Sequence, residues 1–112
     1  MDKFSIQSDT NSDVAVVTAS GRFDSETAPS LDAELTKVVN EKNKIVLDLK
    51  GVDYLSSAGL RAIVKVLQAA QKSGGGVKLA CTSEPVEIIL RTVGMMEMLK
   101  NYPSVNDAVA SF

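Results

Sequence analysis

The sequence predicts an α/β fold in which helices pack on a largely parallel β-sheet. An alternating apolar and polar N-terminal region indicates a hairpin, and helix-like and strand-like segments then alternate along the chain. The length of 112 residues suits one domain, spanning 1–112. Hydrophobic residues make up 45% of the chain and aromatic residues only 4%, which predicts an aliphatic core.

Two strands and a helix are expected before the polar run NEKNK. The segment FSIQ (Phe4–Gln7) predicts a half-exposed strand, and VAVVTAS (Val14–Ser20) predicts a second strand that pairs with it as a hairpin. In the junction that follows, Asp24, Ser25 and Thr27 are each able to cap a helix. That helix is indicated by apolar residues at three- and four-residue spacing: Ala28, Leu31, Leu35 and Val38.

The centre of the chain has the pattern strand, helix, strand. The run IVLDL (Ile45–Leu49) is nearly continuous, as expected of a strand covered on both faces, and Asp53 beyond it is expected in a turn. A helix is expected to follow this strand and to end at the glycines Gly74–Gly76. The segment VKLAC (Val77–Cys81) then predicts the next strand, with Cys81 as a small buried residue. The helix is expected to bury Leu60, Ile63, Val64 and Leu67, and to turn Arg61, Lys65, Gln68 and Lys72 toward water.

The C-terminal third predicts two short helices with an edge strand between them. Ser83 is expected to cap the first of these helices, which ends at Gly94. The segment Met98–Tyr102 favours an edge strand. Ser104, with Asp107 three residues later, resembles a capping box that opens a last helix.

Composition excludes several classes of function. The formal net charge is −2 with both signs interspersed, whereas nucleic-acid binding typically shows a basic stripe. The absence of histidine argues against triad and zinc chemistry. A lone cysteine fits a reducing compartment, and neither a signal peptide nor a membrane-length apolar run is evident. We therefore expect a cytoplasmic protein without a metal site, a cofactor or direct membrane insertion.

The most informative stretch is YLSSAGL (Tyr54–Leu60), at the junction of the central strand and the best amphipathic helix. Serine is a favoured helix cap, so Ser56 or Ser57 could simply satisfy an amide of the first turn. A serine at a helix start is also accessible to a kinase. A phosphate there would add about −1.5 to −2 charges, which would roughly double the net charge of the chain. The residues themselves leave both interpretations open.

Three other candidates are weaker. Asp24, Asp48 and Asp53 could converge as a magnesium site, but the chain lacks a phosphate-cradling glycine loop, and helix capping or a turn explains them as well. A hydrolase with a serine nucleophile would need an unusual base, because histidine is absent. Three clustered methionines could fill core gaps or form an adaptable contact surface: Met95, Met96 and Met98.

Four blocks of sequence resemble the STAS domain: GRFDSETAPSLDAEL, KIVLDLKGVDYLSSAGLRAIV, GGGVKLACTSEPVEIILRTVGMMEML and SVNDAV. More narrowly, they resemble the single-domain bacterial anti-sigma factor antagonists, and LDLKGVDYLSSAGL is the most specific part. The resemblance implies a mixed sheet with helices largely on one face, and no enzymatic activity.

The resemblance also implies a partner-switching cycle. The unmodified antagonist binds a serine kinase that acts as an anti-sigma factor, and the kinase then releases its target. The kinase phosphorylates a serine at the start of the second helix, which weakens the complex. A metal-dependent serine/threonine phosphatase restores the unmodified form.

Carried over by position, the phosphoacceptor is Ser57, with Ser56 as the alternative. The resemblance places the acidic residue Asp24 near it. The partner-binding edge implied in this way comprises Asp24, Ser56, Ser57, Ala58, Gly59 and Arg61. The chain departs from the family pattern at two of these positions, because Ser56 replaces an acidic residue and Ala58 replaces a serine or threonine. An alternative function is a constitutive subunit of a lipid-transport or stressosome-like assembly.

Overall fold

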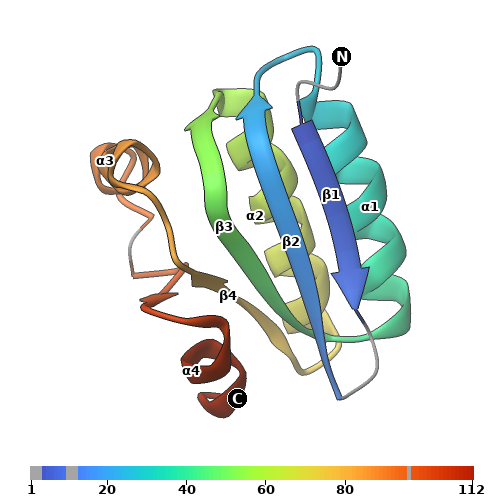
Figure 1. Ribbon diagram of the computed structural model, residues 1–112. Coiled ribbons are helices and arrows are strands. Elements are labelled where there is room, and N and C mark those ends of the chain that lie inside the picture. Colours follow the sequence, from blue (N-terminus) through green and yellow to red (C-terminus); the bar gives the residue numbers. More distant parts are fainter. Residues whose placement is uncertain (1–3, 10–12, 96) are drawn as a thin grey trace.

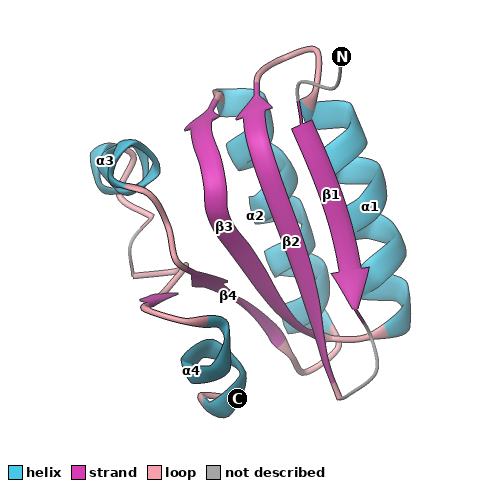
Figure 2. Ribbon diagram, viewed as in Figure 1, coloured by secondary structure: helices cyan, strands magenta, loops and turns pink. Residues whose placement is uncertain are grey.

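The computed structural model describes residues 4–9, 13–95 and 97–112, and Figures 1 and 2 show how its strands and helices are arranged. In chain order these elements are β1 (Phe4–Asp9), β2 (Val14–Phe23), α1 (Ala28–Glu41), β3 (Lys44–Leu55), α2 (Ser57–Lys72), β4 (Gly76–Ala80), α3 (Glu84–Thr92), β5 (Asn101–Tyr102) and α4 (Val105–Ala110). None of the helices in the described part of the chain is long and apolar enough to cross a membrane.

The sheet has the strand order β1-β2-β3-β4-β5. β1 runs antiparallel to β2, with Ile6 opposite Ala19, which confirms the predicted hairpin. The pairs β2–β3, β3–β4 and β4–β5 are all parallel. This mixed α/β sheet is the predicted fold class.

The main core lies between the sheet and helices α1 and α2, which lie behind the strands in Figure 1. Residues of β2 and β3 at every second position face these helices, as the period of a strand requires. The buried face of α1 is the predicted one, Ala28, Leu31, Leu35 and Val38. Helix α3 adds Val86 and Leu90 to the same core.

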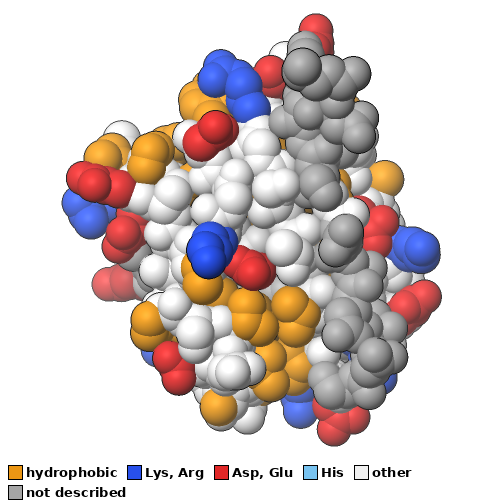
Figure 3. Space-filling view, viewed as in Figure 1, with side chains coloured by type: hydrophobic (Ala, Val, Ile, Leu, Met, Phe, Trp, Pro, Cys, Tyr) orange, Lys and Arg blue, Asp and Glu red, His pale blue; other side chains and the backbone are white. Residues whose placement is uncertain are grey.

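Helix α4 covers part of the opposite face of the sheet. There Ala108 packs with Val14, Val46 and Ala80 in a second apolar cluster. Figure 3 looks onto this side and shows hydrophobic side chains gathered between α4 and the lower part of β2. Because Val46 and its neighbours Ile45 and Leu47 are all fully buried, the prediction that this strand is covered on both faces is confirmed.

Both central strands are longer than the sequence predicts. Asp53 was expected in a turn, but it lies in β3, which continues to Leu55. The β2–β3 pairing is irregular between Thr18 and Ser20. A Cβ on Gly51 would lie 2.6 Å from the Ser20 Cβ, so only glycine fits the close approach of the strands here. Irregular pairing changes which side chains of a strand face the core. The alternation of apolar and polar residues in the sequence does not show where such an irregularity occurs.

Three further predictions are wrong in detail. Val64 is only half-buried, and Val66 takes its place in the core because the apolar stripe of α2 is rotated. Cys81 is half-buried just after β4, with φ of 57° and its thiol 3.4 Å from the Pro103 carbonyl oxygen. The edge strand expected over Met98–Tyr102 is reduced to its last two residues.

The two described methionines of the cluster lie in different environments. Met95 is half-buried against the main core, and Met98 is about half exposed. Met96 lies outside the described residues. Met95 thus fills space beside the core, and Met98 faces solvent.

Candidate functional site

The two serines lie where the central strands β2 and β3 end. Phe23 and Leu55 are the last paired residues of these strands. The backbone amide of Ser56 donates to the Phe23 carbonyl oxygen at 2.8 Å, so the start of α2 is fixed to the end of β2. The site is therefore built on the ends of the two central strands, where Phe23 and Leu55 are both buried.

Ser56 is the residue that caps α2. Its backbone is extended, with φ −78° and ψ 173°, and its Oγ accepts a hydrogen bond from the Gly59 amide at 3.3 Å. Its carbonyl oxygen accepts the first helical bond, from the Leu60 amide at 3.0 Å. The hydroxyl satisfies one of the amides that a helix start leaves without a partner.

Ser57 has a different environment. It is the first residue of α2, its side chain is exposed, and its hydroxyl makes no hydrogen bond to any described residue. The first turn of α2 carries no acidic residue, so nothing there offsets the positive end of the helix dipole. The structure thus divides two roles that the sequence left open: Ser56 caps the helix, and Ser57 faces solvent.

Gly59 lets α2 approach the strands. The residue is buried, and a Cβ at this position would lie 2.9 Å from Leu55 Cδ2 and 3.4 Å from the Phe23 carbonyl oxygen. The resemblance assigned Gly59 to the partner-binding edge. In the structure its position serves the packing that holds the two serines in place.

Asp24 organises the turn that precedes α1. Its carboxylate accepts hydrogen bonds from the amides of Glu26 at 2.9 Å and Thr27 at 3.2 Å. Partial desolvation raises the pKa of Asp24, but these two bonds, the Thr27 hydroxyl and the Arg22 charge outweigh it, so the pKa lies below its ordinary 3.8. Asp24 is thus a negative charge held in place close to the end of β2.

Thr27, rather than Asp24, is the residue that immediately precedes α1. Its buried hydroxyl donates to the Arg22 carbonyl oxygen at 2.7 Å and lies 2.9 Å from the Asp24 amide, which donates to it. Its Oγ makes no cap bond to α1 itself. The sequence placed Thr27 among three possible caps. In the structure it occupies the cap position, but its hydroxyl bonds the preceding turn instead of the helix.

Arg22 is a site residue that the sequence analysis missed. Its guanidinium carbon lies 4.2 Å from the centre of the Tyr54 ring, and its Nε lies 3.7 Å from an Asp24 carboxylate oxygen. Arg22 and Tyr54 are partners in the parallel register of β2 and β3. The only signal in the sequence is the position of Arg22 between Gly21 and Phe23, and that does not reveal its partner.

Helix α3 starts at the same edge of the sheet. Ser83 occupies the expected cap position, but its Oγ makes no bond to the helix and donates instead to the Val52 carbonyl oxygen at 2.7 Å. Val52 belongs to β3, four residues before Ser56. This bond ties the start of α3 to the strand that leads into the site.

Ala58 and Arg61 line a groove between α1 and α2 that begins next to Ser57. Ala58 is half-buried and Arg61 is exposed. Of the residues assigned to the partner-binding edge, the structure therefore exposes Ser57 and Arg61, partly buries Asp24, Ser56 and Ala58, and buries Gly59.

The acidic residues do not gather into a metal site. Within the described ranges, no group of three His, Cys, Asp or Glu side chains could hold a metal ion, so Asp24, Asp48 and Asp53 do not converge. Asp48 instead accepts a hydrogen bond from the Lys50 amide at 3.1 Å.

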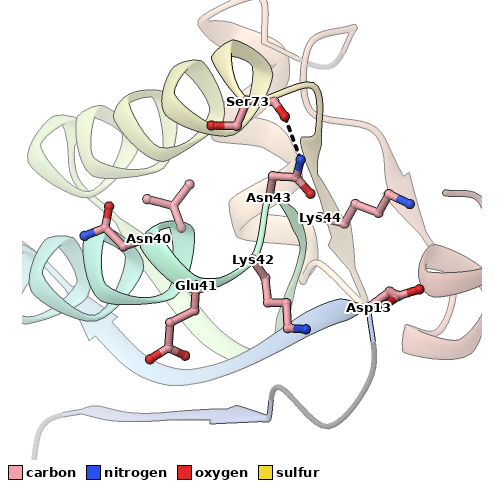
Figure 4. A pocket seen from close by; sticks show the side chains of 8 residues that line it. Asp13, Asn40, Glu41, Lys42, Asn43, Lys44 and Ser73 are labelled. Carbon is pink, nitrogen blue, oxygen red and sulfur yellow. Dashed lines mark hydrogen bonds between the residues drawn. The ribbon is translucent and has the colours of Figure 1, made fainter.

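A hollow of about 480 Å³ lies at the other end of the strands (Figure 4). It is polar, and Asn43 donates to the Ser73 carbonyl oxygen across it at 2.7 Å. Its lining residues, which include Lys42 and Ser73, lie where α1 and α2 end. The hollow is therefore separate from the serine pair at the start of α2.

Comparisons with known proteins agree with this geometry. The STAS domain model matches residues 5–108. BtrV of Bordetella bronchiseptica, named as a candidate anti-sigma factor antagonist, is 31% identical over 93 residues, which cover 82% of this chain and 80% of BtrV. The crystal structure of an anti-sigma factor antagonist from Mycobacterium paratuberculosis has a TM-score of 0.81 at 26% identity, covering 96% of this chain and 92% of that one.

SpoIIAA is a more distant structural neighbour, solved in two forms. Its unphosphorylated form has a TM-score of 0.82 at 13% identity and covers 96% of this chain and 95% of its own. The phosphorylated form, from Bacillus, has a TM-score of 0.74 at 12% identity and covers 96% and 98%. At this identity the likeness shows the fold alone. The match over residues 5–108, supported by relatives named as anti-sigma factor antagonists, shows that the chain belongs to the STAS domain family.

Proposed function

We propose that this protein is an anti-sigma factor antagonist-type regulator in a partner-switching pathway. In its unphosphorylated form it binds a serine kinase that acts as an anti-sigma factor, and this binding releases the kinase's target. Phosphorylation of Ser57 weakens the complex, and a metal-dependent serine/threonine phosphatase reverses the modification. The single observation that carries the proposal is the exposed hydroxyl of Ser57, which bonds none of the described residues, beside a neighbour whose hydroxyl caps the helix.

The physical effect of the phosphate is electrostatic and steric. A phosphoserine carries about −1.5 to −2 charges at neutral pH, and at an interface it adds repulsion and a desolvation cost. At the first position of α2 it also meets the positive end of the helix, which stabilises a negative group. Phosphorylation should therefore change partner binding without unfolding the domain.

The family relationships support this proposal. BtrV and the Mycobacterium paratuberculosis protein are both named for anti-sigma factor antagonism. SpoIIAA, which shares the fold, was solved with and without phosphorylation, so a domain of this architecture can carry a phosphoryl group and remain folded. In this cycle the chain is a binding protein in the cytoplasm, and phosphoryl transfer is carried out by the kinase and the phosphatase.

Intact-mass measurement of three proteins tests the phosphoacceptor. The cognate kinase would be incubated with ATP and with wild type, Ser56→Ala or Ser57→Ala. Wild type and Ser56→Ala should each gain one phosphate, and Ser57→Ala should gain none. Phosphate on Ser57→Ala with none on Ser56→Ala would instead make Ser56 the acceptor.

A binding measurement tests the switch itself. Ser57→Asp should bind the kinase at least tenfold more weakly than wild type. The matched control is Ser73→Asp, which adds the same charge at an exposed residue at the other end of α2 and should bind as wild type does. Equal affinity of wild type and Ser57→Asp would contradict a phosphorylation-controlled interface.

The second candidate is a constitutive subunit of a lipid-transport or stressosome-like assembly. The observation that favours it is Ser56, which stands where the family pattern has an acidic residue. This alternative predicts stable co-purification with the other subunits, unaffected by ATP or phosphatase. The switching proposal predicts that ATP releases the partner.

A further inference from the structure

The groove between α1 and α2 is an apolar channel with charged edges. Its cavity volume is about 320 Å³. It begins beside Ser57, because Ala58 is part of its wall, and it follows α2 for two turns. We call it the α1–α2 groove, and its lining residues are Ser25, Ala28, Pro29, Asp32, Ala58, Arg61, Ala62 and Lys65.

Small side chains form the floor of the α1–α2 groove. Ala28 and Ala62 are buried there, and Ala58 and Pro29 are partly or fully exposed beside them. Alanine fills little of the space between two helices and offers methyl groups to whatever enters. Burial of apolar surface stabilises a complex, so a partner's aliphatic side chain would be bound favourably here.

The edges of the α1–α2 groove are predominantly positive. Lys65 Nζ lies 3.2 Å from Asp32 Oδ1, so this lysine and the only acidic residue of the lining neutralise each other. Arg61 is exposed, and no carboxylate of the described residues lies within salt-bridge distance of it. Its guanidinium is the uncompensated charge of the groove.

The rest of α2 adds to this positive potential. Between Ser57 and Lys72 the helix carries basic residues but no acidic one. The positive end of its dipole points toward the mouth of the groove at Ser57. An apolar floor beside an unpaired guanidinium matches a ligand that combines an aliphatic side chain with a carboxylate, since Arg binds carboxylates in a two-pronged geometry.

We infer that the α1–α2 groove binds an acidic, leucine-bearing segment of the protein partner, with leucine on the alanine floor and a carboxylate on Arg61. The link to switching rests on the proposed function. A phosphate on Ser57, next to Ala58, would place about −1.5 to −2 charges at the mouth of the groove. That charge would offset the potential that attracts the acidic segment, so the segment would bind less tightly.

A peptide titration followed by ¹⁵N NMR tests the inference without a kinase. The probe is acetyl-Asp-Glu-Leu-Leu-Glu-Asp-amide, compared with its Asn/Gln analogue and with an analogue that has two glycines in place of the leucines. We expect saturable shifts of the Ala28, Ala58 and Ala62 amides with the probe, and at least tenfold weaker binding of both analogues. Arg61→Glu should weaken probe binding at least tenfold.

Lys72→Glu is the matched control, because it makes the same charge change on α2 outside the groove and should alter affinity less than twofold. Absence of groove shifts at millimolar probe would overturn the inference. The inference would also be overturned if the glycine analogue bound as tightly as the probe, or if a short single-stranded oligonucleotide caused equal shifts. Either result would mean that the groove attracts any polyanion.

The switching link is tested in the same titration with Ser57→Asp, which should bind the probe at least threefold more weakly than wild type. Failure of the proposed function would look different. Phosphate on Ser57→Ala would contradict that function and leave the peptide result standing, whereas loss of groove shifts would leave the phosphoacceptor intact.

Discussion

The Oγ of Ser56 accepts a hydrogen bond from the Gly59 amide at 3.3 Å, three residues along the first turn of α2. This bond commits one of two adjacent hydroxyls to the fold. The other, on Ser57, is exposed and makes no bond to the described residues. The stabilising role of Ser56 and the phosphoacceptor role proposed for Ser57 can therefore be tested separately by single substitutions at neighbouring positions.

Removal of the cap should cost stability, and removal of its neighbour should not. Ser56→Ala should lower the free energy of unfolding by about 1 kcal/mol, because the Gly59 amide loses its partner. Ser57→Ala, at an exposed helical position, should change it by less than about 0.5 kcal/mol. Urea unfolding followed by circular dichroism measures both values, and equal losses would contradict the division of roles.

Gly59→Ala should destabilise the domain even though alanine is the better helix former. Alanine gains about 1 kcal/mol over glycine in a helix interior. The new methyl group, however, would lie 2.9 Å from Leu55 Cδ2, and Leu55 is buried and unable to move aside freely. We expect a net loss of about 1–2 kcal/mol, since overpacking costs about 1–3 kcal/mol.

Gly76→Ala is the control for this substitution. There a Cβ would meet only a Phe112 ring carbon, at 4.0 Å. Its unfolding free energy should stay within about 0.5 kcal/mol of wild type. If Gly59→Ala and Gly76→Ala lowered the free energy of unfolding by the same amount, close packing at Gly59 could not explain the loss.

Thr27→Val should cost about 1–3 kcal/mol, the usual range when a buried hydrogen-bonding group loses its partner. The substitution keeps the shape of the side chain but leaves the Arg22 carbonyl oxygen and the Asp24 amide without the hydroxyl that joins them. Thr36→Val removes an exposed hydroxyl that bonds only Asp32, and serves as the control. Thermal unfolding of the two variants should differ clearly, and similar melting temperatures would argue against a structural role for the buried hydroxyl.

Asp24 should make stability depend on pH in the acid range. Its pKa in the folded state lies below 3.8, so its contribution is complete above the unfolded pKa and is lost as pH falls through the folded one. The gap in melting temperature between wild type and Asp24→Asn should stay constant above about pH 5 and shrink below about pH 4. Calorimetry across this pH range measures the gap. A gap that widens on acidification would contradict a lowered pKa of Asp24 in the folded state.

Periodicity made much of the fold predictable. Strand residues at a spacing of two and helix residues at three and four depend only on local geometry, so the hairpin and the buried face of α1 follow from the sequence. A run such as Ile45–Leu49, apolar at nearly every position, similarly indicates a strand covered on both sides. These signals need no knowledge of which elements become neighbours.

Features that depend on neighbours were not predictable. The irregular pairing near Ser20 arises where β2 and β3 meet in a particular register, and the pairing of β3 with β2 continues beyond Asp53 to Leu55. The contact between Arg22 and Tyr54 depends on the same register. Which serine caps α2 depends on the residue at which the helix begins, and a one-residue shift would exchange the two roles.

Three hydrogen bonds hold the loops of the site to the two central strands. They run from the Thr27 hydroxyl to Arg22, from the Ser56 amide to Phe23, and from the Ser83 hydroxyl to Val52. With its loops anchored in this way, the modified and unmodified chains would share one backbone. In the proposed cycle, the lifetime of each signalling state would then be set by the enzymes that add and remove phosphate, with no slow refolding step to delay the response.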